Sequence, residues 1–143
     1  MRHTIHQLYV GQSAEFTKTI SESDVYLFAG ITGDHNPMHV NDIYAKQTRY
    51  KERICHGMLS SSLISTVIGT KLPGNGSIYV EQDLLFKAPV LFGDTISAVV
   101  ETEEIDMEKN RVKLRTYCKN QNDIIVLDGY AVVIPPKPME SPM

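Results

Sequence analysis

The chain has 143 residues, which is enough for one ordinary domain and too few for two. Its composition, 42% hydrophobic and 22% charged with a net charge of −3, is that of a globular protein. Because no excess of basic residues is present, the composition argues against nucleic acid and anionic membranes as partners.

The N-terminal quarter predicts a strand over residues 14–20 followed by a helix over 22–31. Ser21 is a favourable helix N-cap, and Asp24 stands where a capping box has Glu or Gln. Val25, Phe28 and Ala29 share one face of this helix, and Gly33 can end it.

The next segment contains Asn36-Pro37, which opposes a regular helix. We therefore expect residues 34–40 to form a stiff loop, with a short helix over 41–47 after it.

A long helix is predicted over residues 56–70, a run without a single charged residue. Its apolar residues recur at helical spacing: Leu59, Leu63, Ile64, Val67 and Ile68. A helix without charge on any face is normally enclosed by other elements. The run is shorter than the roughly 20 residues that a membrane-spanning helix needs, so we expect a buried helix and no membrane segment.

From residue 77 onward the hydrophobic period changes to two, which predicts strands over 77–87, 94–107, 111–119 and 124–134. The alternation is clearest in 111–119, where Val112, Leu114, Thr116 and Cys118 face one way. Gly129 within the last strand indicates a bulge or a close approach. Short polar turns predict antiparallel pairing, so the expected fold is a two-layer α+β domain with about five strands.

We expect one domain over residues 1–134 and a Pro-rich tail over 135–143, because proline cannot donate to a sheet. The N-terminus does not resemble a signal peptide. Cys55 and Cys118 match no metal-binding spacing and are expected to be reduced thiols, which favours a cytoplasmic location.

Asp34 and His39 are the candidate catalytic residues. They stand at the two ends of a loop stiffened by Pro37, and loops on a rigid scaffold often carry catalytic groups. A carboxylate and an imidazole held at a fixed separation could share one water molecule and move its protons. The alternative is an ordinary tight turn, since the segment is rich in turn-forming residues.

Five segments resemble proteins of the MaoC-like family, in particular the R-specific enoyl-CoA hydratases, also called hydratase-2. The segments are 10–12 (VGQ), 28–39 (FAGITGDHNPMH), 54–59 (ICHGML), 72–79 (LPGNGSIY) and 86–94 (FKAPVLFGD). The resemblance runs in order from about residue 10 to residue 134.

The resemblance implies a hot-dog fold, in which an antiparallel sheet wraps a long central helix, and pairing as a homodimer. It implies reversible syn hydration of a trans-2-enoyl thioester, with acyl-CoA or an acyl carrier protein thioester as substrate. Asp34 and His39 match the catalytic residues, and Asn36 matches the residue that braces their loop. Gly57 matches the position whose N–H receives the thioester oxygen, and Ser65 matches a serine that lines the site. We expect no cofactor and no metal ion.

Several nearby residues have two interpretations. His35 is expected to be an exposed loop residue, although a third catalytic group is the alternative. His56 is expected to have a structural role at the start of the helix, and contact with the ligand is the alternative because it adjoins Gly57. A basic cluster precedes the central helix and consists of Arg49, Lys51 and Arg53. We expect it to be a solvated face, and the alternative hypothesis is that it contacts the phosphates of CoA.

Three other functions compete with an enoyl-CoA hydratase. A 3-hydroxyacyl-[acyl carrier protein] dehydratase would use the same two residues. An acyl-CoA thioesterase of this fold typically has a carboxylate on the central helix, and none lies between Gly57 and Thr70. A non-catalytic acyl-binding module would have no need of the Asp34–His39 pair.

Overall fold

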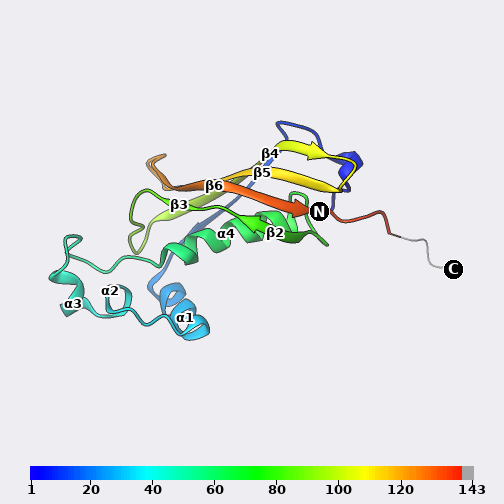
Figure 1. Cartoon of the computed structure of the whole chain (residues 1–143). Helices are drawn as coiled ribbons and strands as arrows, with labels where there is room; N and C mark the ends of the chain where they lie inside the picture. The colour runs from blue at the N-terminus through cyan, green and yellow to red at the C-terminus, as the bar shows by residue number, and fades with distance from the viewer. Residues whose placement is uncertain (140–143) are drawn as a thin grey trace.

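The computed structural model describes residues 1–139 and shows a helix lying across one antiparallel sheet (Figure 1). The last four residues of the predicted tail, 140–143, lie outside the described residues. The strands are β1 (Ser13–Thr19), β2 (Ile78–Gln82), β3 (Leu85–Phe86), β4 (Thr95–Asp106), β5 (Arg111–Lys119) and β6 (Ile125–Ile134). The helices are η1 (Ile5–Gln7), α1 (Glu22–Thr32), α2 (Pro37–Val40), α3 (Asp42–Lys46) and α4 (Gly57–Thr70).

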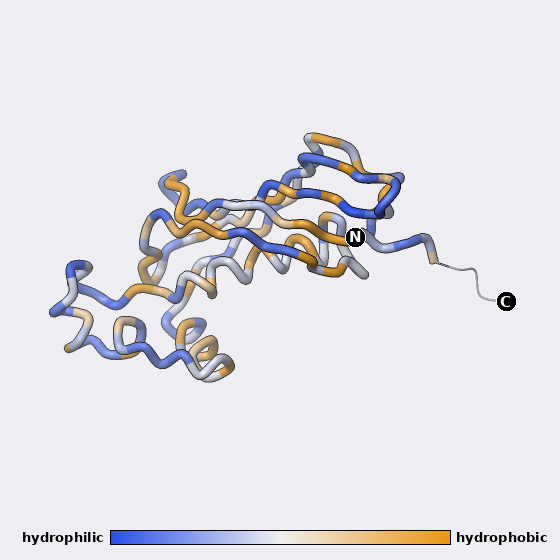
Figure 2. The backbone as a smooth tube through the Cα atoms, viewed as in Figure 1, coloured by the Kyte–Doolittle hydropathy of each residue, from blue (hydrophilic) through white to orange (hydrophobic). Residues whose placement is uncertain are grey.

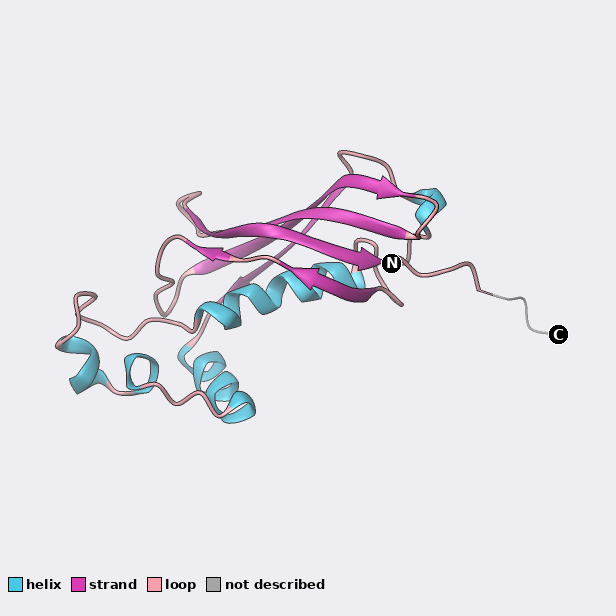
Figure 3. Cartoon of the chain, in the orientation of Figure 1, coloured by secondary structure: helices cyan, strands magenta, loops and turns pink. Residues whose placement is uncertain are grey.

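The sheet has the order β1-β4-β5-β6-β2, and β3 also pairs with β6. The helix α4 contacts β1, β4 and β5, whereas α1, α2 and α3 lie together beyond its N-terminal end (Figure 3). This is the wrapped helix of a hot-dog fold, as the sequence predicts.

The core lies between α4 and the facing side of the sheet. The side chains of Leu63, Ile64, Val67 and Ile68 on α4 are buried there. In Figure 2 this helix is pale to orange along its length and has no strongly hydrophilic residue. The other face of α4 remains exposed, for example at Met58. Within one chain, therefore, other elements cover only one side of this helix and do not enclose it completely.

The predicted alternation in β5 is confirmed, because Val112, Leu114, Thr116 and Cys118 are all buried. The strands β4, β5 and β6 follow one another as an antiparallel meander, also as predicted.

The single strand predicted over 77–87 is wrong, since the structure has β2 and β3 with a break at residues 83–84. At the break the backbone carbonyl of Asp83 lies directly against Gly129, so close that a Cβ atom could not fit there. The close approach expected at Gly129 is therefore confirmed. The sheet has six strands instead of about five because the predicted strand is divided.

The caps of α1 agree with the sequence. Ser21 accepts a hydrogen bond from the Asp24 N–H, and the Asp24 carboxylate accepts one from the Ser21 N–H. At the other end Gly33 adopts a left-handed conformation with φ 80°. Aspartate can thus complete the capping box where glutamate is more usual.

The expectation of a loop throughout residues 34–40 is wrong, because α2 begins at Pro37. Proline is well tolerated as the first residue of a helix, where its missing N–H would have no partner in any case. Asn36 supplies the N-cap by accepting a hydrogen bond from the Met38 N–H at 3.1 Å.

No helix within residues 1–139 is both long and apolar enough to cross a bilayer. The domain boundary at residue 134 remains a prediction, with which the end of β6 at Ile134 is consistent.

Candidate active site

The segment from Thr32 to Met38 is held by three hydrogen bonds that follow each other along the chain. The Thr32 hydroxyl accepts from the Asp34 N–H at 3.2 Å, and the Asp34 carboxylate accepts from the Asn36 N–H at 3.2 Å. The Asn36 side chain then accepts from the Met38 N–H. Each bond spans two residues, so local sequence alone defines this conformation. The Asp34 side chain is exposed, but its direction is set.

His39 lies on α2 and is buried, with 8% of its surface exposed. Its Nδ1 is 2.6 Å from the backbone carbonyl oxygen of Ile54. Because a carbonyl can only accept, Nδ1 carries the hydrogen, and Nε2 of the neutral ring has a free lone pair.

The pKa of His39 is lowered, mainly because burial disfavours the charged ring. The nearby His56 lowers this pKa further, while the hydrogen bond to Ile54 and the charge of Asp34 oppose the shift. At neutral pH the His39 ring is therefore neutral and can accept a proton at Nε2.

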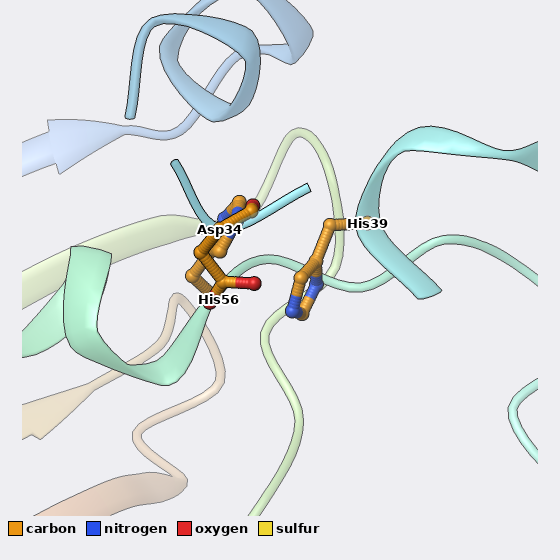
Figure 4. A group of neighbouring side chains, drawn as sticks. All are labelled: Asp34, His39 and His56. Carbon is orange, nitrogen blue, oxygen red and sulfur yellow. The ribbon is translucent and has the colours of Figure 1, made fainter. Parts of the chain in front are cut away.

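His56 is the residue directly before α4 and lies against His39. The ring centroids are 3.9 Å apart and the ring planes are inclined by 30°. Figure 4 shows the Asp34 carboxylate directed toward the His39 ring, with His56 beside Asp34. Polar side-chain atoms of these three residues all lie within 4.8 Å of one another. Two parts of the chain, residues 34–39 and the residue before α4, thus meet at one point.

These three side chains are also the group within residues 1–139 that could hold a metal ion. Their lone pairs suit a divalent transition metal, since imidazole nitrogen and carboxylate oxygen are usual zinc ligands. The same lone pairs suit proton transfer with no metal.

The N-terminus of α4 points at this group. Gly57 begins the helix, and N–H groups of the first turn have no partner within a helix. Together with the helix dipole they favour an atom that carries negative charge. A Cβ atom on Gly57 would lie 2.7 Å from the Phe86 ring, so a side chain here would displace that ring.

A cavity of about 470 Å³ is lined by both His39 and Gly57. It is walled mainly by apolar side chains from α4, β3, β6 and the segments around them, with His39 and Gly57 in the wall and Arg49 and Lys87 among the polar residues. The lining residues are His39, Arg49, Tyr50, Ile54, Cys55, Gly57, Met58, Ser60, Phe86, Lys87, Ala88, Pro89, Val90, Val126 and Leu127. Such a cavity fits an apolar chain with a polar head, because few polar groups are placed among many apolar ones.

Polar side-chain atoms of Asp34 and His39 lie within 4.8 Å of each other, and His39 shares the cavity wall with Gly57. The catalytic and binding roles of these residues remain predictions. Asn36 is exposed, and its side chain caps α2 without reaching the cavity. Ser65 lies on the exposed face of α4 and outside the cavity of this chain, so its role as a lining residue remains a prediction. His35 is exposed, as expected.

The three residues of the basic cluster separate in the structure. Arg53 turns away and binds the carboxylates of Glu22 and Asp42 at 2.9 and 2.7 Å. Arg49 lines the cavity, whereas Lys51 is exposed and outside it.

Sequence reasoning missed Phe86, Lys87 and Ser60 as residues of the cavity. Phe86 and Lys87 open the 86–94 segment that carries part of the family resemblance, which was the available signal. Ser60 had no distinguishing signal, since it is one of three consecutive serines.

The chain is similar to known proteins over nearly its whole length. A family model described as "MaoC like domain" matches residues 7–123. An (R)-specific enoyl-CoA hydratase of Rhodospirillum rubrum is 51% identical, covering 94% of this chain and 92% of the relative. A 3-hydroxybutyryl-CoA dehydratase of Methylorubrum extorquens is 45% identical, covering 94% of this chain and 85% of the relative.

Solved structures agree with these similarities. The unliganded R-hydratase from Pseudomonas aeruginosa superposes with a TM-score of 0.89 at 43% identity and covers 99% of this chain and 95% of its own. The match of both sequence and fold, over almost the full length of the compared proteins, shows that this chain belongs to the MaoC-like family.

Proposed function

We propose that this protein is an R-specific enoyl-CoA hydratase, which adds water reversibly to a trans-2-enoyl-CoA to give the (R)-3-hydroxyacyl-CoA. The observation that carries the proposal is the neutral His39 imidazole facing the Asp34 carboxylate, in the wall of an apolar cavity that also contains the N-terminus of α4. The names of the relatives support the same reaction.

In the hydration direction the Nε2 lone pair of His39 accepts a proton from water while the water oxygen bonds to C3 of the substrate. The C2=C3 π bond breaks, and its electrons move toward the thioester carbonyl. The proton held by the pair then passes to C2. Asp34 stabilises the imidazolium that forms in between, because an opposite charge close by favours the protonated ring. One water thus adds to one face of the double bond, and His39 returns to its neutral state.

The thioester oxygen is assigned to the N–H groups at the start of α4, that of Gly57 first. Negative charge builds up on this oxygen during addition, and donors fixed in advance stabilise it most. The Phe86 ring lies beside Gly57 in the cavity wall. Asn36 holds α2, and with it His39, in place.

Arg49 and Lys87 are the basic residues of the cavity wall and are proposed to contact the phosphates of the carrier. The Lys87 Nζ lies 3.8 Å from the Asp128 carboxylate, so this ion pair is loose enough to be exchanged for a phosphate. This assignment replaces Arg53, whose guanidinium is already paired.

The homodimer expected from the sequence also belongs to the proposal. The strand β2 lies at one end of the sheet order and exposes Ile78 and Val80, which are 58% and 53% exposed. An apolar edge strand invites pairing unless something covers it. A second copy of the chain is proposed to do so. The cytoplasmic location likewise stays a prediction, with which the free, buried Cys55 and Cys118 are consistent.

The decisive experiment compares wild type with Asp34→Asn in a spectrophotometric assay that follows the loss of enoyl-CoA absorbance. We expect wild type to turn over a short trans-2-enoyl-CoA and to give the (R) product on a chiral column. Loss of one member of an acid–base pair costs about 10²- to 10⁴-fold in rate, so we expect at least a 100-fold loss of kcat in the variant. An (S) product, or a variant with near wild-type activity, contradicts the proposal.

The same preparation separates the competing functions. Turnover of acyl carrier protein thioesters, with none of CoA thioesters, would make the protein a carrier-protein dehydratase. Release of free thiol from an acyl-CoA would indicate a thioesterase. Thermal stabilisation by acyl-CoA without any turnover would indicate a binding module.

A further inference from the structure

His56 is buried, with 2% of its surface exposed, yet helix capping does not account for its position. It occupies the N-cap position of α4, but its side chain makes no capping hydrogen bond. Its Nδ1 is buried and has no hydrogen-bond partner among residues 1–139. A buried acceptor without a partner costs stability, so an apolar residue would be the better choice for the fold alone.

The other ring nitrogen of His56 explains its position. Nε2 lies 2.9 Å from the backbone carbonyl oxygen of Asp34, a residue 22 positions earlier in the chain. Since a carbonyl only accepts, Nε2 carries the hydrogen and donates it. This bond joins the start of α4 to the segment that carries the Asp34 carboxylate. The hydrogen bonds of the Asp34 N–H and carboxylate are local, and the other long-range bond of the segment lies at its far end, where the Met38 carbonyl accepts from the Ile54 N–H at 3.2 Å.

The ring of His56 also faces the ring of His39, with centroids 3.9 Å apart. On another side it contacts the Phe28 ring at 4.9 Å. The His39 ring is therefore fixed by two contacts, its hydrogen bond to Ile54 and the face of His56. A second imidazole this close disfavours a charge on His39.

We propose that His56 is a positioning residue for the Asp34–His39 pair: its Nε2–H holds the backbone of Asp34, and its ring packs against the His39 ring and orients it. The inference rests on the proposed function and goes beyond it, because it assigns a role to a residue outside the pair. It adds a role at the pair to the structural role expected of His56 at the helix start.

The titratable groups around His39 are few. Asp34 and His56 are in the group itself, and the other titratable residues of the cavity wall are Arg49, Tyr50, Cys55 and Lys87. Burial raises the pKa of Cys55 to about 12, so this thiol is uncharged. If a substitution at residue 56 shifts the pKa of His39 and leaves the other titratable groups in place, the shift can be assigned to the loss of His56.

Two substitutions separate the two parts of the role. His56→Phe keeps an aromatic ring against His39 but removes the donor to Asp34. His56→Gln keeps an N–H donor at the position of Nε2 but removes the ring. His35→Gln is the matched control. It makes the same substitution, histidine to glutamine, at an exposed side chain next to Asp34.

For His56→Phe we expect kcat to fall roughly tenfold or more with KM unchanged, because small errors in the position of a reacting group cost rate and not binding. For His56→Gln we expect the His39 ring signals in NMR to titrate at higher pH than in wild type, and the acidic limb of kcat/KM to move the same way. His35→Gln should match wild type in all measurements.

Wild-type kcat in His56→Phe would overturn the first part of the role, and an unchanged His39 titration in His56→Gln would overturn the second. A loss of kcat that only mirrors a smaller folded fraction, measured by circular dichroism, also counts against the proposal. If wild type hydrates no enoyl thioester, the proposed function fails, whereas the NMR titration still tests the effect of His56 on His39.

Discussion

At the scale of single residues, the ring of His39 is held so that one nitrogen remains for chemistry. Nδ1 is engaged by the Ile54 carbonyl, and burial lowers the pKa of the ring. The neutral form is the one that can accept a proton from water, as the proposed mechanism requires of His39. The sequence alone identifies residue 39 as a histidine in the motif. Its tautomer, however, depends on a contact with Ile54, which lies 15 positions away in the chain.

The pH dependence of activity follows from this lowered pKa. His39 must be neutral to accept a proton, so activity is lost as pH falls through its pKa. Because that pKa lies below the ordinary value of 6.5, we expect the acidic limb of kcat/KM to lie below pH 6.5. The limb belongs to the coupled Asp34–His39 pair and is measured as kcat/KM against pH. An acidic limb above pH 6.5 would show that His39 is not held neutral.

The start of α4 gives a second prediction at this scale. In Gly57→Ala the new methyl group meets the Phe86 ring, which must swing into the cavity or out of it. We expect kcat/KM for an enoyl-CoA to fall roughly tenfold or more, since the donors to the thioester oxygen and the cavity shape both change. Stability should change little, because the Phe86 side chain is half exposed and can rotate.

Gly69→Ala is the control for this prediction. It lies on the same helix, where a Cβ atom would meet nothing within 4 Å. We expect wild-type kinetics and a gain in stability of up to about 1 kcal/mol, because alanine has the higher helix propensity. Equal kinetic losses in both variants would mean that the effect is general to the helix.

At the scale of elements, α2 is a helix of four residues that exists because of its cap. Asn36→Ala removes that cap, which costs about 1 kcal/mol locally, and it loosens the element that carries His39. We expect kcat to fall several-fold while global unfolding in urea changes by no more than about 1 kcal/mol. Unchanged kcat would show that His39 is held without the cap.

Asn41→Ala offers a matched comparison, because Asn41 caps α3 through a 3.0 Å hydrogen bond from the Tyr44 N–H. The helix α3 carries none of the proposed site residues. We therefore expect a similar small cost in stability with no loss of kcat.

The elements differ in how far their sequence predicts them. The sequence predicts the helix α1 because its capping residues lie within a few consecutive positions. It predicts the strand β5 because buried and less buried residues alternate along it. The helix α2 was missed because Asn36-Pro37 is compatible with a loop and with a capped helix start. The break between β2 and β3 was missed because its cause, Gly129, lies in another strand.

At the scale of the whole molecule, the exposed apolar edge at β2 argues for assembly. We expect wild type to have twice the 16.1 kDa mass of one chain by light scattering. Ile78→Lys places a charge on the exposed edge and should shift the protein toward monomer.

Met107→Lys is the control for this shift, since Met107 is 52% exposed but lies in the turn between β4 and β5. It should leave the mass unchanged. A monomeric wild type would refute the dimer, and an unchanged mass in Ile78→Lys would place the interface elsewhere.

The sequence by itself determined the fold class, the order of most elements and the pair Asp34 and His39, because these depend on periodicity, caps and motifs within short segments. Only the tertiary structure decided which residues meet. It placed His56 against both Asp34 and His39, paired Arg53 with Glu22 and Asp42, and added Phe86 and Lys87 to the cavity. The physical reason is distance along the chain: these contacts join segments whose approach is set by the packing of α4 against the sheet, and no local pattern encodes that approach.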